Sequence, residues 1–235
     1  MVSEDTTQAD CLSKIDAILQ ESVAAGVTGL PATITSSRGR WTFVAGVSDL
    51  ESQQPITATH LFGVGSITKV FTAVVIFQLI EEGKLQLSDT FEPLDYIRRP
   101  RLTAPERGNY YYANTNYELL GFMVEKITQN TAEAEIRRRT LEPLGMDHTF
   151  LEGFEEQNQG TMTKRHHFAT EEYREAAGIN AAFPKLQDGK LIDCTASNLS
   201  FGWTAGGMVS TPSDRVKFAT AVRDGGCSVR NRLLL

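Results

Sequence analysis

The chain has 235 residues, of which 41% are hydrophobic and 22% are charged, and this composition excludes a disordered, collagen-like or coiled-coil protein. A net charge of −6 and an isoelectric point of about 5.3 disfavour binding to duplex DNA or to an anionic membrane. The three cysteines lie far apart and form no Cys-x-x-Cys pair, so neither a disulfide framework nor a cysteine-based zinc site is expected.

The first quarter of the chain predicts a helix followed by a β-hairpin. Apolar residues recur at intervals of three and four over Asp10–Ala24, which is the pattern of one helix face. Two short runs of strand-forming residues, Leu30–Ser36 and Trp41–Val47, flank a turn at 37–40 and predict an antiparallel hairpin. The polar segment Gln53–Thr59 predicts a loop.

Helices dominate the rest of the chain. The strongest pattern covers Ser66–Glu82, where apolar residues occupy so many sides that we predict a central, buried helix. The remaining predictions are an irregular segment at Leu87–Arg107, helices at Asn116–Thr128 and Thr131–Leu141, loops with short elements at 152–200, and a last helix capped by Thr211.

A serine and a lysine three residues apart open the predicted buried helix. Ser66 and Lys69 would share one helix face, so that the amine reaches the serine hydroxyl. Burial would favour the neutral amine, a proton acceptor, and the helix N-terminus would stabilise negative charge developing at the serine. Alone, the pair also fits an N-cap serine and a solvated lysine. The apolar flanks favour the catalytic interpretation, because a buried lysine needs a partner.

A second polar group precedes the helix predicted at Asn116–Thr128. Tyr112 and Asn114 are two residues apart, so in an extended segment their side chains would point the same way. The phenol would relay a proton and the amide would bind a substrate carbonyl, if both meet Ser66 and Lys69. The plainer interpretation is an aromatic cluster that leads into a helix capped by Asn114 or Asn116.

Together, Ser66-Ile67-Thr68-Lys69 and Tyr112-Ala113-Asn114 resemble the first two motifs of the serine β-lactamase and penicillin-binding-protein superfamily. The branch that the chain most resembles contains class C β-lactamases, D-alanyl-D-alanine carboxypeptidases and related esterases. The resemblance implies an α/β (α+β) fold of the β-lactamase/transpeptidase type, with a helical subdomain and an incomplete antiparallel sheet. It implies Ser66 as the acylated nucleophile, Lys69 as its activating base, Tyr112 as proton relay and Asn114 as substrate-binding residue, with no metal and no organic cofactor.

The resemblance extends over residues 12–226 and predicts one incomplete β-lactamase-related domain over 1–235. Its parts would be the helix and hairpin (10–65), the helical region with both motifs (66–150), and loops with the capped helix (151–235). The superfamily's third motif, Lys-Thr-Gly or His-x-Gly, does not occur after Thr211. We therefore expect a C-terminally truncated copy that lacks one oxyanion-hole donor, a loss that typically costs about 10²–10³ in rate.

These observations predict a serine hydrolase that cleaves an amide or ester bond through an acyl-serine intermediate and is impaired by the missing motif. The candidate substrates are D-amino-acid peptides, β-lactams and small esters. The alternatives are a non-catalytic relative that serves in binding or assembly, and an active site completed by another chain. The expected partner is a small-molecule or peptide substrate, not a nucleic acid, and open sheet edges favour self-association.

Two further expectations concern location and metal binding. The acidic, polar N-terminus shows no signal peptide, and no apolar stretch is long enough to span a membrane, so we predict a cytoplasmic protein. His166 and His167 lie in a basic cluster whose spacing does not suit metal ligation, and we predict a solvated loop there.

Overall fold

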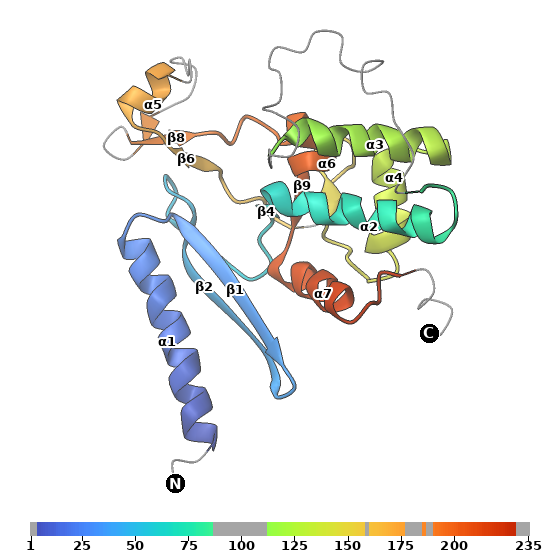
Figure 1. The fold of residues 1–235 in the computed structure, drawn as a ribbon. Coiled ribbons are helices and arrows are strands. Elements are labelled where there is room, and N and C mark those ends of the chain that lie inside the picture. The colour runs from blue at the N-terminus through green and yellow to red at the C-terminus, as the bar shows by residue number, and fades with distance from the viewer. Residues whose placement is uncertain (1–3, 87–111, 158–159, 177–184, 187–189, 229–235) are drawn as a thin grey trace. The chain divides into compact units, whose positions relative to one another are not determined.

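The computed structural model describes residues 4–86, 112–157, 160–176, 185–186 and 190–228 (Figure 1). The segment predicted to be irregular, Leu87–Arg107, lies outside the described residues. The chain divides into two compact units, each assembled from separate stretches of sequence. The first unit comprises Met1–Phe62, Gln159–Asn198 and Thr211–Val216, and the second unit comprises Gly63–Asn158, Leu199–Ser210 and Lys217–Leu235.

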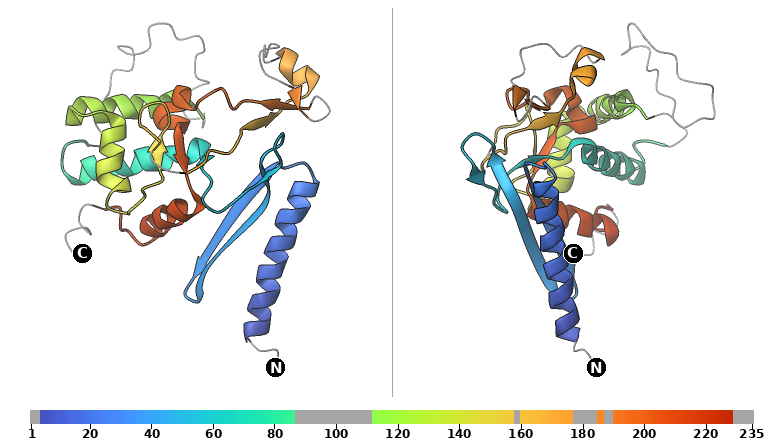
Figure 2. Two further views of the ribbon diagram at one scale, coloured as in Figure 1. Left: turned by 180° about the vertical axis from the view of Figure 1, so that it is seen from behind. Right: turned by 90° about the vertical axis from the view of Figure 1, so that its left-hand side faces the viewer.

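A long helix and a hairpin form the N-terminal part of the first unit. Helix α1 (Glu4–Ala24) lies along strands β1 (Gly29–Ser36) and β2 (Gly39–Asp49), as Figures 1 and 2 show from three sides. The helix begins at Glu4, before the predicted Asp10, whereas its end agrees with the prediction. Leu19 is buried on this helix, and the neighbouring Ile18 is exposed, so only one face of α1 packs against the hairpin.

The predicted hairpin is confirmed, with a tighter turn than expected. Strands β1 and β2 pair antiparallel from Gly29 opposite Gly46 to Ser36 opposite Gly39, which leaves two residues in the turn. Gly46 has a φ of +82°, and a Cβ there would lie 2.3 Å from the Thr28 carbonyl oxygen. The close approach of the two strands at this end therefore requires glycine.

Two short strands in the first unit correct the sequence predictions. Strand β3 (Gln54–Pro55) pairs with β2 in a segment predicted to be a loop. His166 and His167 belong to strand β6 (His166–Phe168), not to a solvated loop, and desolvation by burial lowers the pKa of His166. The other elements of this sheet, whose strand order is β6-β8-β7, are β7 (Lys185–Leu186) and β8 (Leu191–Asp193), and α5 (Glu171–Ala176) follows β6.

Helices build most of the second unit. A single turn of 3-10 helix, η1 (Gly65–Ile67), leads into α2 (Thr68–Glu81), so the predicted helix at Ser66–Glu82 has a tighter first turn than an α-helix. The other elements of this unit are α3 (Asn114–Thr128), α4 (Ala132–Ile136), the π-helix η3 (Arg137–Leu141), β5 (Phe150–Leu151), η4 (Ser200–Gly202), α6 (Trp203–Gly206) and β9 (Met208–Ser210).

The hydrophobic core of the second unit lies along one side of α2. Phe71, Val75 and Leu79 of this helix are fully buried. Among the described residues of α2, the side chains of Val70 and Phe77 are exposed. The prediction that this helix is buried on nearly all sides is therefore wrong at these two positions. The residues that complete the buried core are Val64, Ile76, Leu85, Val124, Ile136, Leu141, Met146, Leu151, Met208 and Phe218.

Two further elements agree with local sequence signals. Helix α7 (Pro212–Arg223) begins after Thr211, whose hydroxyl accepts a hydrogen bond of 3.2 Å from the Asp214 amide, as the capping pattern predicts. Strands β4 (Phe62–Gly63), β9 and β5 form a small sheet in the order β4-β9-β5. No helix within the described ranges is long and apolar enough to cross a membrane.

Candidate active site

The backbone before α2 holds Ser66 at the start of a helix. Gly65 adopts the left-handed conformation, with a φ of +52°, and turns the chain from β4 into η1. The Thr68 hydroxyl donates to the Gly65 carbonyl at 2.7 Å and accepts from the Met208 amide at 3.1 Å. Because the first N–H groups of a helix have no partner within it, the Ser66 amide is placed where it can bind an anionic oxygen.

The Lys69 side chain is buried and makes three hydrogen bonds. Its exposed fraction is 6%, and its Nζ donates to Ser66 Oγ at 3.3 Å, Asn114 Oδ1 at 2.8 Å and the Ala205 carbonyl at 2.7 Å. Three acceptors match the three N–H donors of a protonated lysine. In this geometry Lys69 is therefore a donor to Ser66, and its role as an activating base stays a prediction.

Tyr112 brings a second polar group to the serine. Its phenol donates to Ser66 Oγ at 2.7 Å, and its ring centroid is 5.0 Å from Lys69 Nζ. Hydrogen bonding with Lys69 makes the largest contribution to lowering the pKa of the phenol below its usual value, and hydrogen bonding with Ser66 makes the next largest. Tyr112 is 54% exposed, so the phenol meets both Ser66 and the solvent from which a substrate would enter.

Asn114 contributes its side chain to the site and does not cap a helix. Ala113 is the N-cap of α3, without a side-chain capping bond, and its extended backbone places Tyr112 and Asn114 on the same side. The alternative interpretation, in which Asn114 or Asn116 caps this helix, is therefore wrong. Asn114 is instead the first residue of α3, and its side chain is turned towards Lys69.

Several groups at the site have no signal in the sequence that points to them. The Ala205 carbonyl is a main-chain atom, and Tyr117 lies with its ring centroid 5.5 Å from Lys69 Nζ. The segment that carries Ala205 is fixed by hydroxyls: Thr72 donates to the Thr204 carbonyl at 2.8 Å, and Thr204 donates to the Tyr117 carbonyl at 2.9 Å. The sequence does place Thr72 one turn after Lys69 on the same face of the predicted helix, and this is the one feature that points to a role for Thr72 near Lys69.

All four residues singled out in the sequence thus come together in the second unit. Ser66, Lys69, Tyr112 and Asn114 are joined by hydrogen bonds through the Ser66 hydroxyl and the Lys69 amine. Among the described residues, no group of three histidine, cysteine or acidic side chains is arranged to hold a metal ion.

The sequence model of the Beta-lactamase family matches residues 15–93 and 90–234, which is most of the chain. The chain belongs to the beta-lactamase family. Membership in the beta-lactamase family confirms the resemblance drawn from the Ser66–Lys69 and Tyr112–Asn114 motifs.

The curated relatives described here are distant in sequence from this chain and longer than it. A beta-lactamase from Pseudomonas fluorescens is 26% identical over an alignment of 179 residues, which covers 59% of this chain and 49% of the relative. Unguisins hydrolase ungD from Aspergillus violaceofuscus is 22% identical over 179 residues, which covers 53% of this chain and 32% of the relative. The chain thus spans about half, or less, of the length of the curated relatives that it matches.

Solved structures of other proteins share the fold of this chain. A D-amino acid amidase from Ochrobactrum anthropi SV3 superposes with a TM-score of 0.78 at 24% identity, over 92% of this chain and 72% of the amidase. The octameric penicillin-binding protein homologue from Pyrococcus abyssi gives a TM-score of 0.69 at 22% identity, over 89% of this chain and 56% of that one. The predicted fold class, helices with small antiparallel sheets of the β-lactamase/transpeptidase type, is confirmed.

Proposed function

We propose that this chain is a serine hydrolase that cleaves an amide or ester bond through an acyl intermediate on Ser66. The observation that carries the proposal is that one hydroxyl oxygen, Ser66 Oγ, accepts hydrogen bonds from both the Tyr112 phenol and the Lys69 amine. The name of the Ochrobactrum amidase supports an amide as the bond cleaved, and the name of the Aspergillus relative supports hydrolysis.

The proposed reaction has two steps. In the first, Ser66 Oγ attacks the substrate carbonyl carbon, its proton passes to the Tyr112–Lys69 pair, and the same pair returns a proton to the leaving amine or alcohol. In the second, water attacks the acyl carbon, and the proton that it loses restores the Ser66 hydroxyl. The Ser66 amide would donate to the developing oxyanion, and Asn114 would orient the substrate carbonyl through its side-chain NH2 group.

The decisive experiment is covalent labelling of Ser66. Purified protein is incubated with a fluorophosphonate or a fluorescent penicillin, and the mass of the intact chain and the labelled peptide are determined by mass spectrometry. We expect one adduct on Ser66, which disappears in Ser66→Ala and persists in the matched control Ser13→Ala, since Ser13 is an exposed residue of α1. A folded wild-type protein that takes no label, or an equal label on Ser66→Ala, would refute the proposal.

A second candidate is a protein that binds such substrates with little or no turnover. It is favoured by one observation, that neither Lys-Thr-Gly nor His-x-Gly follows Thr211 within these 235 residues. A missing oxyanion-hole donor would lower the rate by about 10²–10³. Release of the acyl group after labelling with the fluorescent penicillin separates the two, because a binding protein would keep the adduct or never form it. An impaired hydrolase would instead shed it slowly.

The pH dependence of labelling tests the role of Tyr112. A phenol whose pKa is lowered loses its proton at a lower pH than free tyrosine, whose pKa is 10.0. We therefore expect the labelling rate to rise with pH and to reach half of its increase below pH 10.0. Tyr112→Phe should lose this rise, and Tyr117→Phe should keep it. The same midpoint in Tyr112→Phe and in the wild type would assign the titration to another group.

A further inference from the structure

Thr204 is hydrogen-bonded to both helices that carry the candidate site, α2 and α3. Its side chain is fully buried, and its hydroxyl donates to the Tyr117 carbonyl of α3 at 2.9 Å. Its own carbonyl accepts from the Thr72 hydroxyl of α2 at 2.8 Å. The next residue along the chain, Ala205, presents its carbonyl to Lys69 Nζ at 2.7 Å. Thr204 is therefore one peptide bond away from a group that contacts Lys69.

The short helix α6, which carries Thr204, lies so close to α3 that one position of α3 must be glycine. A Cβ at Gly121 would lie 2.5 Å from Thr204 Oγ1 and 3.0 Å from Cη2 of Trp203. Because alanine is more favourable than glycine inside a helix, glycine at this position of α3 has a steric reason. The contact between Thr204 and α3 thus depends on residues of both elements.

The backbone at the start of α6 needs contacts from outside to keep its conformation. Trp203 has a φ of +30°, which a residue with a bulky side chain rarely adopts. Such a conformation persists only where the surrounding structure holds it. The hydroxyls of Thr72 and Thr204 act on the residue directly after Trp203. Loss of one of these bonds would let the strained segment relax, and the Ala205 carbonyl would move with it.

The position of the Ala205 carbonyl matters because of the number of donors that a lysine has. A neutral amine has two N–H groups and one lone pair. Asn114 Oδ1 and the Ala205 carbonyl oxygen only accept, and they lie 2.8 and 2.7 Å from Nζ. When both receive an N–H group of neutral Lys69, the lone pair points to the third neighbour, Ser66 Oγ at 3.3 Å. The carbonyl therefore orients the amine towards the serine.

We propose that Thr204 is a positioning residue for the acylation of Ser66. Its hydroxyl fixes the Ala205 carbonyl and, through this carbonyl, the direction of the Lys69 amine. This role rests on the proposed function, because it requires that Lys69 accepts the proton of Ser66. Thr204 itself takes no proton and binds no substrate. Removal of its hydroxyl therefore slows the chemical step and leaves the binding of a substrate or label unchanged.

The first test removes the Thr204 hydroxyl and then restores it. Thr204→Val has nearly the same shape but no donor, so the limiting rate of fluorophosphonate labelling should fall by about 10-fold to 10²-fold, with the half-saturating concentration unchanged. Thr204→Ser keeps the hydroxyl and should label at close to the wild-type rate. A Thr204→Val variant that labels at the wild-type rate, or a Thr204→Ser variant as slow as Thr204→Val, would overturn the proposal.

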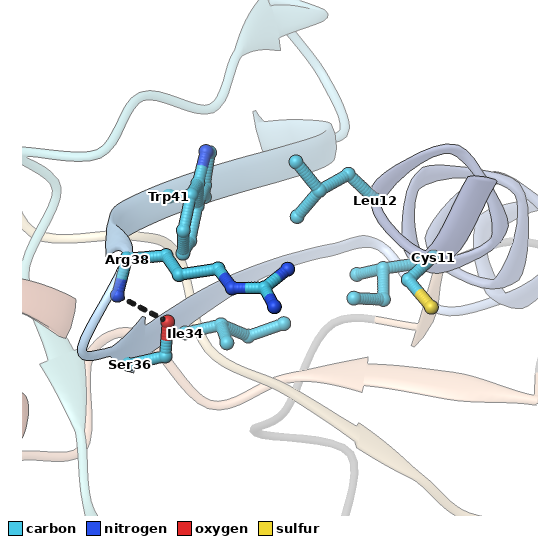
Figure 3. Close-up of a pocket in the computed structure, with 7 residues that line it drawn as sticks. Cys11, Leu12, Ile34, Ser36, Arg38 and Trp41 are labelled. Atoms are coloured by element: carbon cyan, nitrogen blue, oxygen red, sulfur yellow. Dashed lines mark hydrogen bonds between the residues drawn. The ribbon is translucent and has the colours of Figure 1, made fainter. Parts of the chain in front are cut away.

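Two control variants remove hydroxyls that do not act on this segment. Thr140 is a buried threonine of the second unit whose hydroxyl has no hydrogen-bond partner among the described residues, so Thr140→Val should label like the wild type. Ser36→Ala removes a hydroxyl that accepts from the Arg38 amide at 3.1 Å, beside the groove between α1 and the hairpin that Figure 3 shows. It should also label at the wild-type rate. A loss in either control equal to that of Thr204→Val would contradict the proposal.

The second test separates positioning from a general loosening of the fold. In the Lys69→Met protein the Ala205 carbonyl has no amine to orient, so adding Thr204→Val should not lower the residual labelling rate further. An additional loss as large as in the wild-type background would give Thr204 a merely structural role and contradict the proposal. Gly121→Ala forces α3 away from Thr204 and should slow labelling even if Thr204→Val folds poorly. Labelling of Gly121→Ala at the wild-type rate would count against the proposal in the same way.

The third test needs no reaction at Ser66, so failure of this proposal can be told from failure of the proposed function. In protein with isotope-labelled lysine, the nuclear magnetic resonance signal of Lys69 Nζ is identified by its absence from Lys69→Met. The signal should move in Thr204→Val and stay in place in Thr204→Ser and Thr140→Val, because its chemical shift depends on its hydrogen bonds. A moved signal in a protein whose wild type takes no label refutes the proposed function alone. An unmoved signal refutes the positioning role, whatever the labelling shows.

Discussion

Labelling of Ser66 is expected to slow by about 10²–10⁴-fold when Lys69 is replaced by methionine, the range that general acid–base groups contribute. Methionine has a similar length and fits the buried space, but it has no donor for Ser66, Asn114 or the Ala205 carbonyl. The serine oxygen then loses one of its two hydrogen-bond donors, and the pair proposed to take the serine proton loses its amine. The measurement is the second-order rate constant for a fluorophosphonate, with circular dichroism to confirm that the fold persists.

Two further variants serve as controls for the Lys69→Met result. Lys126→Met changes an exposed lysine in the last turn of α3 and should label at the wild-type rate. Lys69→Arg keeps hydrogen-bond donors at this position but does not give up a proton at accessible pH. If Lys69 acts as a base, arginine should be as slow as methionine. Labelling of Lys69→Met at the wild-type rate would remove Lys69 from the mechanism.

Replacing Arg139 by methionine is expected to lower the free energy of unfolding by about 3–5 kcal/mol, the cost of leaving a buried charge without its partner. Arg139 bonds to Glu135, which is 0% exposed, and to both carboxylate oxygens of Glu82. These contacts join η3 and α4 to the end of α2, so the loss affects the helices that carry the site. Urea unfolding followed by circular dichroism measures the change.

The neighbouring arginine is a matched control for this prediction. Arg138 also bonds to Glu135, at 2.8 Å, but its side chain is 58% exposed, so Arg138→Met should cost no more than about 1 kcal/mol. An Arg139→Met variant as stable as Arg138→Met would show that burial of the network contributes nothing.

The same network gives stability a pH dependence with a defined direction. The hydrogen bonds from Arg139 lower the pKa of Glu82 from 4.5 to about 2. A carboxyl whose pKa is lower in the folded state contributes stability above pH 4.5, and this contribution is lost as the pH falls towards 2. Arg139→Met should therefore lose less stability than the wild type over this interval.

Local sequence patterns predicted the elements whose cause is local. The hairpin, the helix capped by Thr211 and the helix after Ser66 follow from periodicity and capping, and the structure has all three. Strands β3 and β6 were missed because each is only two or three residues long, and β6 in addition exists through pairing with β8, which lies far along the chain. The exposure of Val70 and Phe77 depends on which neighbours pack against α2, and periodicity does not contain that information.

In the candidate site, too, the sequence predicts some of the groups and not others. The side chains of Ser66, Lys69, Tyr112 and Asn114 were identified because their residue types and spacings form a recognisable pattern. The Ala205 carbonyl was not, because every residue carries such a group, and only the tertiary fold selects one of them. The hydroxyls of Thr72 and Thr204 hold that carbonyl in place, and threonines in a helical region give no comparable signal.

The double position of Asn114 links the site to the interior of the second unit. Asn114 is at once the first residue of α3 and an acceptor of the Lys69 amine, and further along the same helix Val124 belongs to the buried core. A displacement of α3 would therefore change the contact between Asn114 and Lys69. Mutations in the core far from Ser66 can thus change the reactivity of Ser66 by shifting helix α3, although no residue around the serine is itself replaced.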